Sequence, residues 1–398
     1  LFGRLCSSAS VGFYVQVSHR IGAGELVHAR HILRQSFLSC LLFASALSVI
    51  GILIYSRLPH WLGGGEDICH DASLYFFIFT LGIPFAQLNS LCSGMLRCSG
   101  NMHIPSILNI LMCLLDVVFN YFLIFPSRSF GDWTIPGAGL GVVGAGLGSL
   151  FSFAICSLIM CWFVCARSKE LNLLQDSGTF IPQRDTLKRA VRLSLPLAVE
   201  HIVLCGAQIM STMIVAPLGT VAIAANSFGI TIEALCYMPG YGIADAATAL
   251  VGQSLGAGRM RLARSFGRIT LSMGVAIMTL MAVVMYVFSP ALMSVMSPDV
   301  SVCCLTVDIL RIEALAEPMF AASIICYGIF VGAGDTTVPC TMNLASIWGV
   351  RIVLAALLSG SYGLQGVWIA MAVELTFRGV IFLIRFHSDR WMKGKKIV

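Results

Sequence analysis

The chain has 398 residues, of which 58% are hydrophobic and 11% charged, and its mean hydropathy is +0.88. Soluble domains carry about 25% charged and about 45–50% apolar residues, so this composition excludes a soluble protein. Apolar runs long enough to cross a bilayer as helices recur along the chain, whereas the alternating pattern of a membrane barrel is missing. The sequence therefore predicts an all-α polytopic membrane protein.

Eleven apolar segments follow one another along the chain. The first, from Leu1 to about Gln16, is too short to span a bilayer. It starts without a Met and without a basic stretch before it, so we expect no cleavable signal peptide and a chain truncated inside a helix. The other ten segments run over about 34–56, 72–96, 104–125, 137–165, 190–216, 220–253, 268–288, 302–330, 339–358 and 363–384.

The cations lie mainly in alternate connections between these segments. They gather at 20–34, at Arg97, at 167–192, at 259–268 and in the tail at 385–396. Cytoplasmic loops carry such an excess of Lys and Arg, so these connections and the C-terminus are expected in the cytoplasm of a protein of the cell (plasma or inner) membrane. The net charge of +6 is accounted for in this way and does not indicate nucleic-acid binding.

The polar stretch from Arg167 to Lys188 divides the chain into two halves. We expect an N-terminal lobe at 1–166, a cytoplasmic linker at 167–188, a C-terminal lobe at 189–385 and a cytoplasmic tail at 386–398.

The two halves repeat one another. The stretch 17–30 overlays 251–264 at a shift of 234 residues, and the same shift pairs Pro84 with Pro318 and Gly100 with Gly334. Further on, 141–144 matches 363–366 at a shift of 222, so the first half has a loop about twelve residues longer. Extending the repeat to the N-terminus places the first helix and part of the second outside the chain.

An intact molecule would then hold two parallel repeats of six helices. Repeats related by an axis along the membrane normal are typical of transporters with a substrate path between the halves.

Three motifs resemble the MATE family (multidrug and toxic compound extrusion). They are the stretch 253–259, Gln-Ser-Leu-Gly-Ala-Gly-Arg, with its first-half partner; Val-Ala-Pro-Leu-Gly at 215–219 followed by Ala-Ala-Asn at 224–226; and Gly-Ala-Gly-Asp-Thr at 332–336. The resemblance implies a secondary antiporter that exports organic, mostly cationic and amphipathic compounds in exchange for H⁺ or Na⁺. It implies no cofactor beyond the coupling ion, and small organic cations and the lipid bilayer as partners. The chain is expected to function as a monomer.

Charged residues inside apolar segments are candidates for function, because an ionised side chain there costs at least about 2.5 kcal/mol. Asp116 lies in the middle of a segment with Asn120 one helical turn later. The family often carries an Asn and an Asp at this place, in the opposite order, as part of a cation site. Ser149 falls where the family often has a hydroxyl. We expect these three residues to bind the coupling ion, with a structural, hydrogen-bonded carboxyl as the alternative for Asp116.

The second half offers further acidic candidates. Glu200 and Glu233 are expected to contact substrate or ion, with hydrogen bonds between helices as the alternative. Asp335 matches a carboxylate that takes part in ion coupling in some MATE relatives, and it also fits a helix cap. Glu317, beside Pro318, is a further acidic candidate. Two other residues, Glu374 and Arg378, are spaced to form an ion pair on one helix face.

Other functions fit the sequence less well. A lipid-linked saccharide flippase would need a strongly cationic site for a pyrophosphate. A non-transporting remnant stays an alternative if the missing helices do not exist. No nucleophile–base pair stands out, and no motif G-x-x-x-x-G-K-[ST] is present, so neither an enzyme nor an ATP-driven pump is expected.

Overall fold

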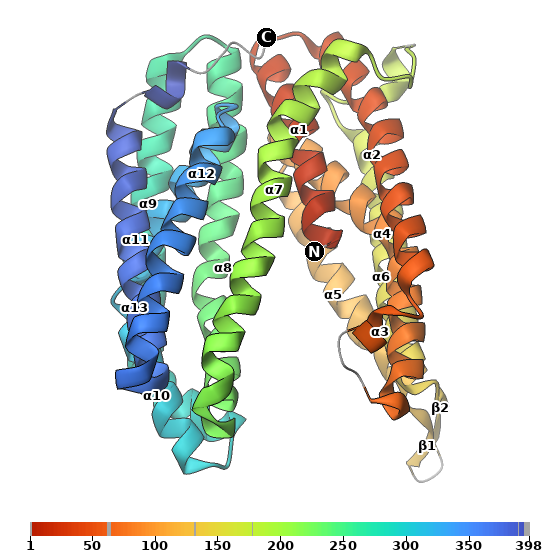
Figure 1. Cartoon of the computed structure of the whole chain (residues 1–398). Coiled ribbons are helices and arrows are strands. Elements are labelled where there is room, and N and C mark those ends of the chain that lie inside the picture. The colour runs from red at the N-terminus through yellow and green to blue at the C-terminus, as the bar shows by residue number, and fades with distance from the viewer. Residues whose placement is uncertain (1, 62–64, 131–132, 177, 389, 394–398) are drawn as a thin grey trace. The chain divides into compact units, whose positions relative to one another are not determined.

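The computed structural model describes residues 2–61, 65–130, 133–176, 178–388 and 390–393 (Figure 1). The chain divides into two compact units, Leu1–Ser194 and Leu195–Val398, and the boundary falls inside helix α7 (Arg184–Val215). The predicted cytoplasmic tail is described only in part, because 389 and 394–398 lie outside the described residues.

The first unit is built from long helices and one short hairpin. A π-helical turn at Phe163–Arg167 follows its last long helix, and a 3-10 turn at Leu173–Gln175 lies in the linker. Its helices and strands are α1 (Phe2–Gly22), α2 (Leu26–Ile54), α3 (Leu58–Trp61), α4 (Glu66–Cys98), α5 (His103–Ile124), β1 (Pro126–Phe130), β2 (Trp133–Ala138) and α6 (Gly141–Trp162).

The second unit starts within α7 and is helical throughout. A π-helical turn at Ile347–Ile352 joins α12 to α13, and 3-10 turns lie at Ala216–Leu218 and Arg390–Lys393. The other helices are α8 (Thr220–Gly256), α9 (Met260–Met296), α10 (Val300–Ala314), α11 (Glu317–Gly332), α12 (Thr337–Ser346) and α13 (Val353–His387). Among the described residues, eight helices are long and apolar enough to cross a membrane when Thr337–His387 is counted as one, or nine if α10 and α11, which meet at 57°, form one broken span.

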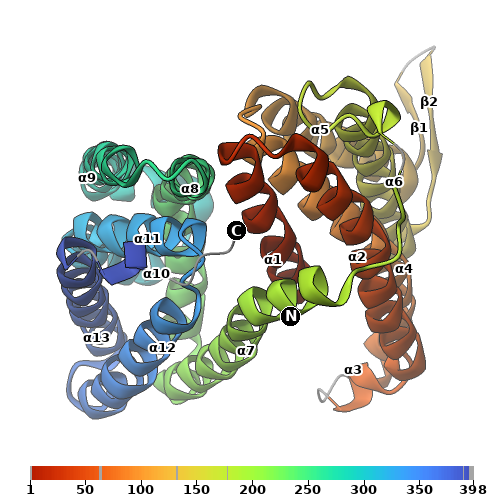
Figure 2. The same ribbon diagram turned by 90° about the horizontal axis from the view of Figure 1, so that it is seen from above.

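The helix boundaries confirm the internal repeat. A shift of 234 residues carries α1 onto the second part of α8, α2 onto α9, and α4 onto α10 together with α11. The same helix pairs are in contact within each unit: α1 with α2 and α4 in the first, and α8 with α9 and α11 in the second. Figure 2 shows α8 and α9 side by side in the view along the helices. Each unit is therefore one copy of the same helical arrangement.

Glycines mark the equivalent turns of the two copies. Gly24 and Gly258 both have positive φ, at 78° and 71°, as do Gly100 and Gly334, at 84° and 79°. Residues with a side chain rarely adopt this conformation, so each turn depends on glycine.

A third pair of glycines separates the last two helices of each unit. Gly141 has φ 54° before α6, and Gly363 has φ 57° and a non-helical ψ inside α13. Gly366 then approaches the backbone of Leu358 so closely that no Cβ would fit. This break confirms that the predicted segments 339–358 and 363–384 are two helices and not one.

The extra loop of the first unit contains a β-hairpin that the sequence analysis does not predict. Strands β1 and β2 pair antiparallel, with Pro126 opposite Ala138. The predicted apolar segment 137–165 accordingly starts too early, since α6 begins at Gly141. Short strands that pair only with each other leave no long hydropathy pattern, which explains why the hairpin was missed.

The polar linker is held against the first unit. The Arg30 guanidinium on α2 donates hydrogen bonds to the Glu170 carbonyl at 2.9 Å, to the Asp176 carboxylate at 2.5 Å and to the Gln175 side chain at 2.7 Å. Leu171, which follows Glu170, is fully buried in the hydrophobic core of the first unit. Arg30 therefore fixes the linker to α2. The distribution of cations along the sequence indicated only that Arg30 lies on the cytoplasmic side of the membrane.

Close contact between α8 and α11 depends on glycine. A Cβ added at Gly328 would lie 2.5 Å from the Ala244 carbonyl oxygen, which belongs to the α8 backbone and cannot turn aside. At Gly242, on the exposed side of the same α8, a Cβ would meet nothing within 4 Å.

We predict that Gly328→Ala destabilises the second unit by about 1–3 kcal/mol, because α8 and α11 must move apart. The apparent unfolding temperature of the protein purified in detergent would fall. Gly242→Ala is the matched control and should hold or raise that temperature, since alanine favours a helix over glycine by about 1 kcal/mol. Equal unfolding temperatures for both variants would contradict this account of the helix contact.

Candidate functional site

The three residues predicted to bind the coupling ion meet where α5 contacts α6. The Ser149 hydroxyl on α6 donates a hydrogen bond of 2.8 Å to Oδ1 of Asp116 on α5. One turn further along α5, Oδ1 of Asn120 is buried against Gly148, and no donor to it is found within the described residues. The helices approach closely because α6 has glycines here: a Cβ at Gly144 would lie 2.5 Å from an α5 carbonyl oxygen.

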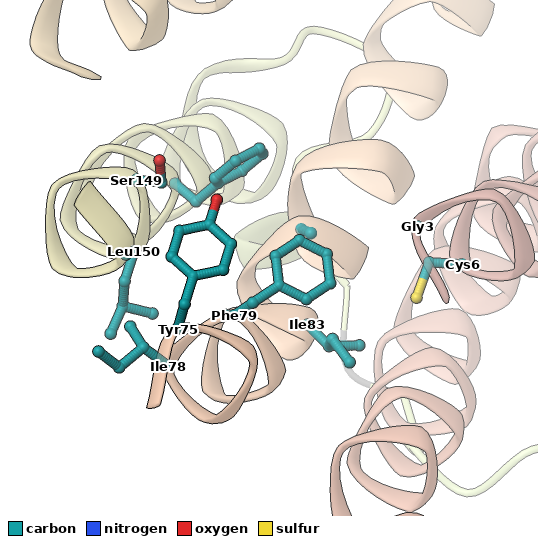
Figure 3. A pocket seen from close by; sticks show the side chains of 12 residues that line it. Gly3, Cys6, Tyr75, Ile78, Phe79, Ile83, Ser149 and Leu150 are labelled. Atoms are coloured by element: carbon teal, nitrogen blue, oxygen red, sulfur yellow. The ribbon is translucent and has the colours of Figure 1, made fainter. Parts of the chain in front are cut away.

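Ser149 also lines an apolar cavity of about 210 Å³ in the first unit. Figure 3 shows the rings of Tyr75 and Phe79 on α4 between α6, which carries Ser149, and α1, which carries Cys6. Nearly all of the lining is hydrocarbon or aromatic ring. Ser149, which donates to the Asp116 carboxyl, thus lies at the wall of the apolar cavity. Such a cavity suits the apolar part of a ligand.

Glu200 in the second unit is held by two neutral donors. Its side chain on α7 is 2% exposed. The Tyr327 hydroxyl donates to one carboxylate oxygen at 2.6 Å, and the Asn343 amide donates to the other at 2.7 Å. Three helices, α7, α11 and α12, are joined through this one carboxylate. These hydrogen bonds between helices match the alternative expected for Glu200 from the sequence.

Asp335 is paired with a cation. Its carboxylate accepts a hydrogen bond from the Arg385 guanidinium on α13, and both side chains are largely buried. The Arg385 guanidinium also stands over the ring of Phe330 at 5.6 Å. Helix α12 follows Thr336 with no side-chain cap, so Asp335 does not act as the helix cap that its sequence context suggested.

Glu233 belongs to a larger group of buried charges in the second unit. It is 8% exposed on α8 and interacts electrostatically with Arg351 and Arg378. Two more glutamates, Glu313 and Glu317, are fully buried nearby and interact with it. We call these residues, together with Glu374 on α13, the buried glutamate cluster.

Glu374 is the best compensated member of the cluster. The predicted pairing with Arg378 is confirmed, with 3.1 Å between the guanidinium Nε and a carboxylate oxygen. The Ser346 hydroxyl donates to the same carboxylate at 2.7 Å, and Arg351 lies 3.9 Å away. Glu374 is therefore an anionic partner of Arg351, which the sequence left unidentified.

The geometry agrees with a comparison to known proteins. A family model described as MatE matches residues 1–122 and 196–357, more than half of the chain. The chain belongs to the MatE family.

Individual relatives are more distant. The probable multidrug resistance protein NorM of Thermotoga maritima is 26% identical over 391 residues, which cover 97% of this chain and 82% of that protein. The multidrug resistance protein MdtK of Yersinia pestis is 22% identical over 386 residues, covering 94% and 80%.

Solved structures share the fold. A mutant of the Vibrio cholerae MATE transporter VcmN has a TM-score of 0.87 at 18% identity, covering all of this chain and 87% of that one. A MOP superfamily transporter from Pyrococcus furiosus has a TM-score of 0.88 at 18% identity, covering 99% and 86%. These likenesses show an all-α, multi-pass fold. Membership of the MatE family makes the chain a membrane transporter and not an enzyme.

Glu313 and Glu317 are two candidate functional residues of this MatE protein that the sequence analysis does not place in the site. The sequence analysis assigns Glu313 no role and treats Glu317 only as a further candidate beside Pro318, yet both are fully buried. They stand four residues apart in the middle of the apolar segment 302–330, and that placement alone marks them as candidates. Within the part of the chain that the structure describes, no group of three or more His, Cys, Asp or Glu side chains is arranged to hold a metal ion.

We predict that Tyr327→Phe destabilises the second unit by about 1–3 kcal/mol, because one oxygen of the buried Glu200 carboxylate loses its donor. Tyr362→Phe is the control, since that ring is 61% exposed. Thermal unfolding of the two purified variants measures the difference. If Tyr327→Phe unfolds at the temperature of the control, the hydroxyl contributes nothing to holding Glu200.

Proposed function

We propose that this MatE-family protein is a secondary antiporter that exports organic, mostly cationic and amphipathic compounds in exchange for H⁺ or Na⁺. The observation that carries the proposal is the contact between Asp116 and Ser149 at the wall of the apolar cavity. A carboxyl attracts a cation, and a hydrocarbon-lined chamber accepts the apolar remainder of such a compound. The names of the relatives, multidrug resistance proteins, point in the same direction.

The coupling energy is sufficient for this exchange. Export of a monovalent cation against 100 mV costs about 2.3 kcal/mol, and an inward H⁺ or Na⁺ returns a similar amount per charge. Coupling requires that the ion and the compound favour different states of the protein or compete for one of them. Asp116, Asn120 and Ser149 supply the oxygens for an ion in the first unit.

We also propose a membrane location and a monomeric state for the protein. The protein lies in the cell membrane with its C-terminus in the cytoplasm, because Arg20, Arg30 and Arg97 stand on the same side as the tail in the predicted topology. It acts as a monomer, since one chain supplies both units. A flippase for lipid-linked pyrophosphate is disfavoured, because the buried glutamate cluster has four carboxyls against two guanidinium groups.

The test measures transport in everted membrane vesicles. We predict that vesicles with the wild-type protein accumulate a fluorescent lipophilic cation when a proton or a sodium gradient is imposed, and that Asp116→Asn abolishes this accumulation. The amide keeps the hydrogen-bonding shape but removes the charge. Asp308→Asn, at an exposed aspartate on α10, is the control and should transport like the wild type.

The outcomes separate the parts of the proposal. The gradient that drives accumulation identifies the coupling ion. Transport by Asp116→Asn at the wild-type rate would remove the first unit from the coupling. No accumulation by the wild type under either gradient, with the protein present in the membrane, would contradict the antiporter function.

A further inference from the structure

Two glutamates flank the break between α10 and α11. Glu313 lies in the last turn of α10 and Glu317 is the first residue of α11, and the two helices meet at 57° (Figure 1). Both side chains are fully buried. None of their four carboxylate oxygens has a hydrogen-bond partner within the described residues. They differ in this respect from Glu200 and Glu374, whose oxygens all have donors or cations.

The internal repeat shows that the fold does not need carboxyls at these places. A shift of 234 residues carries Glu313 onto Phe79 and Glu317 onto Ile83, which line the apolar cavity of the first unit. There α4 continues as one helix through Pro84, whereas the second unit is interrupted before Pro318. The same position in the repeat is therefore apolar in one unit and acidic in the other.

The surrounding charges do not balance. Glu233 on α8 interacts with both glutamates, and Glu374 on α13 interacts with Glu313. The cations of the group are Arg351 on the π-helical turn, which interacts with Glu313, and Arg378 on α13, which interacts with Glu233. The thiol of Cys236 on α8 also interacts with both glutamates. Four carboxylates against two guanidinium groups leave a formal charge of −2 in a buried place. Several kcal/mol oppose each uncompensated buried charge.

We infer that Glu313 and Glu317 bind two exchangeable protons, one on each carboxyl, and that the break between α10 and α11 is a proton site of the second unit. This inference rests on the proposed function, because it names the coupling ion for which the transporter would use the site. Each step forms or breaks one carboxyl O–H bond and exchanges the proton with water. With both protons bound the cluster has no net charge.

Arg351 is the group that makes exchange feasible. It lies on a π-helical turn, a conformation that is rare and frequent at functional sites. Its side chain is 26% exposed, while its partner Glu374 is fully buried. It also interacts with Glu233 and Glu313. Arg351 is thus a positioning residue whose guanidinium stabilises the Glu313 carboxylate that remains when its proton leaves.

Infrared spectroscopy of the purified protein tests the protonation directly. A protonated carboxyl absorbs in a C=O stretching band of its own, separate from the carboxylate bands. We expect the wild type at neutral pH to show such a band, which disappears reversibly as the pH is raised. Glu313→Gln and Glu317→Gln should each remove part of it, and the double variant should remove both parts. Asp308→Asn is the control on the same helix and should leave the band unchanged.

Each result decides the question. A wild type without the band, or a double variant that keeps it whole, overturns the proton site; the wild-type spectrum decides even if the variants fail to fold. Loss of the band when Na⁺ is added at constant pH would show that sodium displaces the protons, and would overturn a site reserved for protons.

Transport by the double variant completes the test. With intact coupling through the cluster, proton-driven accumulation of the cation should fall to that of vesicles lacking the protein. Wild-type accumulation by the double variant would overturn the coupling role. Failure of the wild type to transport would count against the proposed function alone, because the infrared band reports proton binding without any transport.

Discussion

A charge buried in an apolar interior needs compensation, and this constraint orders the polar residues of both units. Glu200 is met by two neutral donors, and Asp335 is met by the guanidinium of Arg385. The first contact joins α7 to α11 and α12, and the second joins the turn before α12 to α13, so compensation also fixes the arrangement of the helices. A carboxyl with no such partner contributes nothing to this framework. Within the described residues, Glu313 and Glu317 have no hydrogen-bond partner. We infer that a bound ligand compensates them.

The repeat shows which features belong to the framework and which to function. Helix ends and left-handed glycines recur at one constant shift, because both copies need the same turns and the same close helix contacts. Arginines outside the apolar segments recur too, as with Arg30 and Arg264, but the acidic residues inside the apolar segments do not. Asp116 corresponds to Val350 in the second half, and Glu317 corresponds to Ile83 in the first. A residue that only one copy carries is not required by the shared fold, so its chemistry is free to serve binding.

Much of the fold was predictable from the sequence because it depends on local and periodic features. Hydropathy gave the spans, the constant shift gave the repeat, and the spacing of Glu374 and Arg378 gave their ion pair. The partners of Glu200 were not predictable, since Tyr327 and Asn343 lie more than a hundred residues further along the chain. The pairing of Asp116 with Ser149 was suggested by the resemblance to a family, and no pattern in the residues themselves required it.

The charge deficit of the buried glutamate cluster also bears on how an exchanger avoids a leak. A proton and a monovalent organic cation each bring one positive charge, so either can reduce the same deficit. Occupation by one weakens the electrostatic attraction for the other, and this coupling is reciprocal by linkage. A fixed ion pair such as that of Glu374 with Arg378 cannot serve in this way, because its compensation never leaves. Exchange therefore needs carboxyls whose positively charged partner can leave. Glu313 and Glu317 are two such carboxyls, and they lie where the helix is interrupted between α10 and α11.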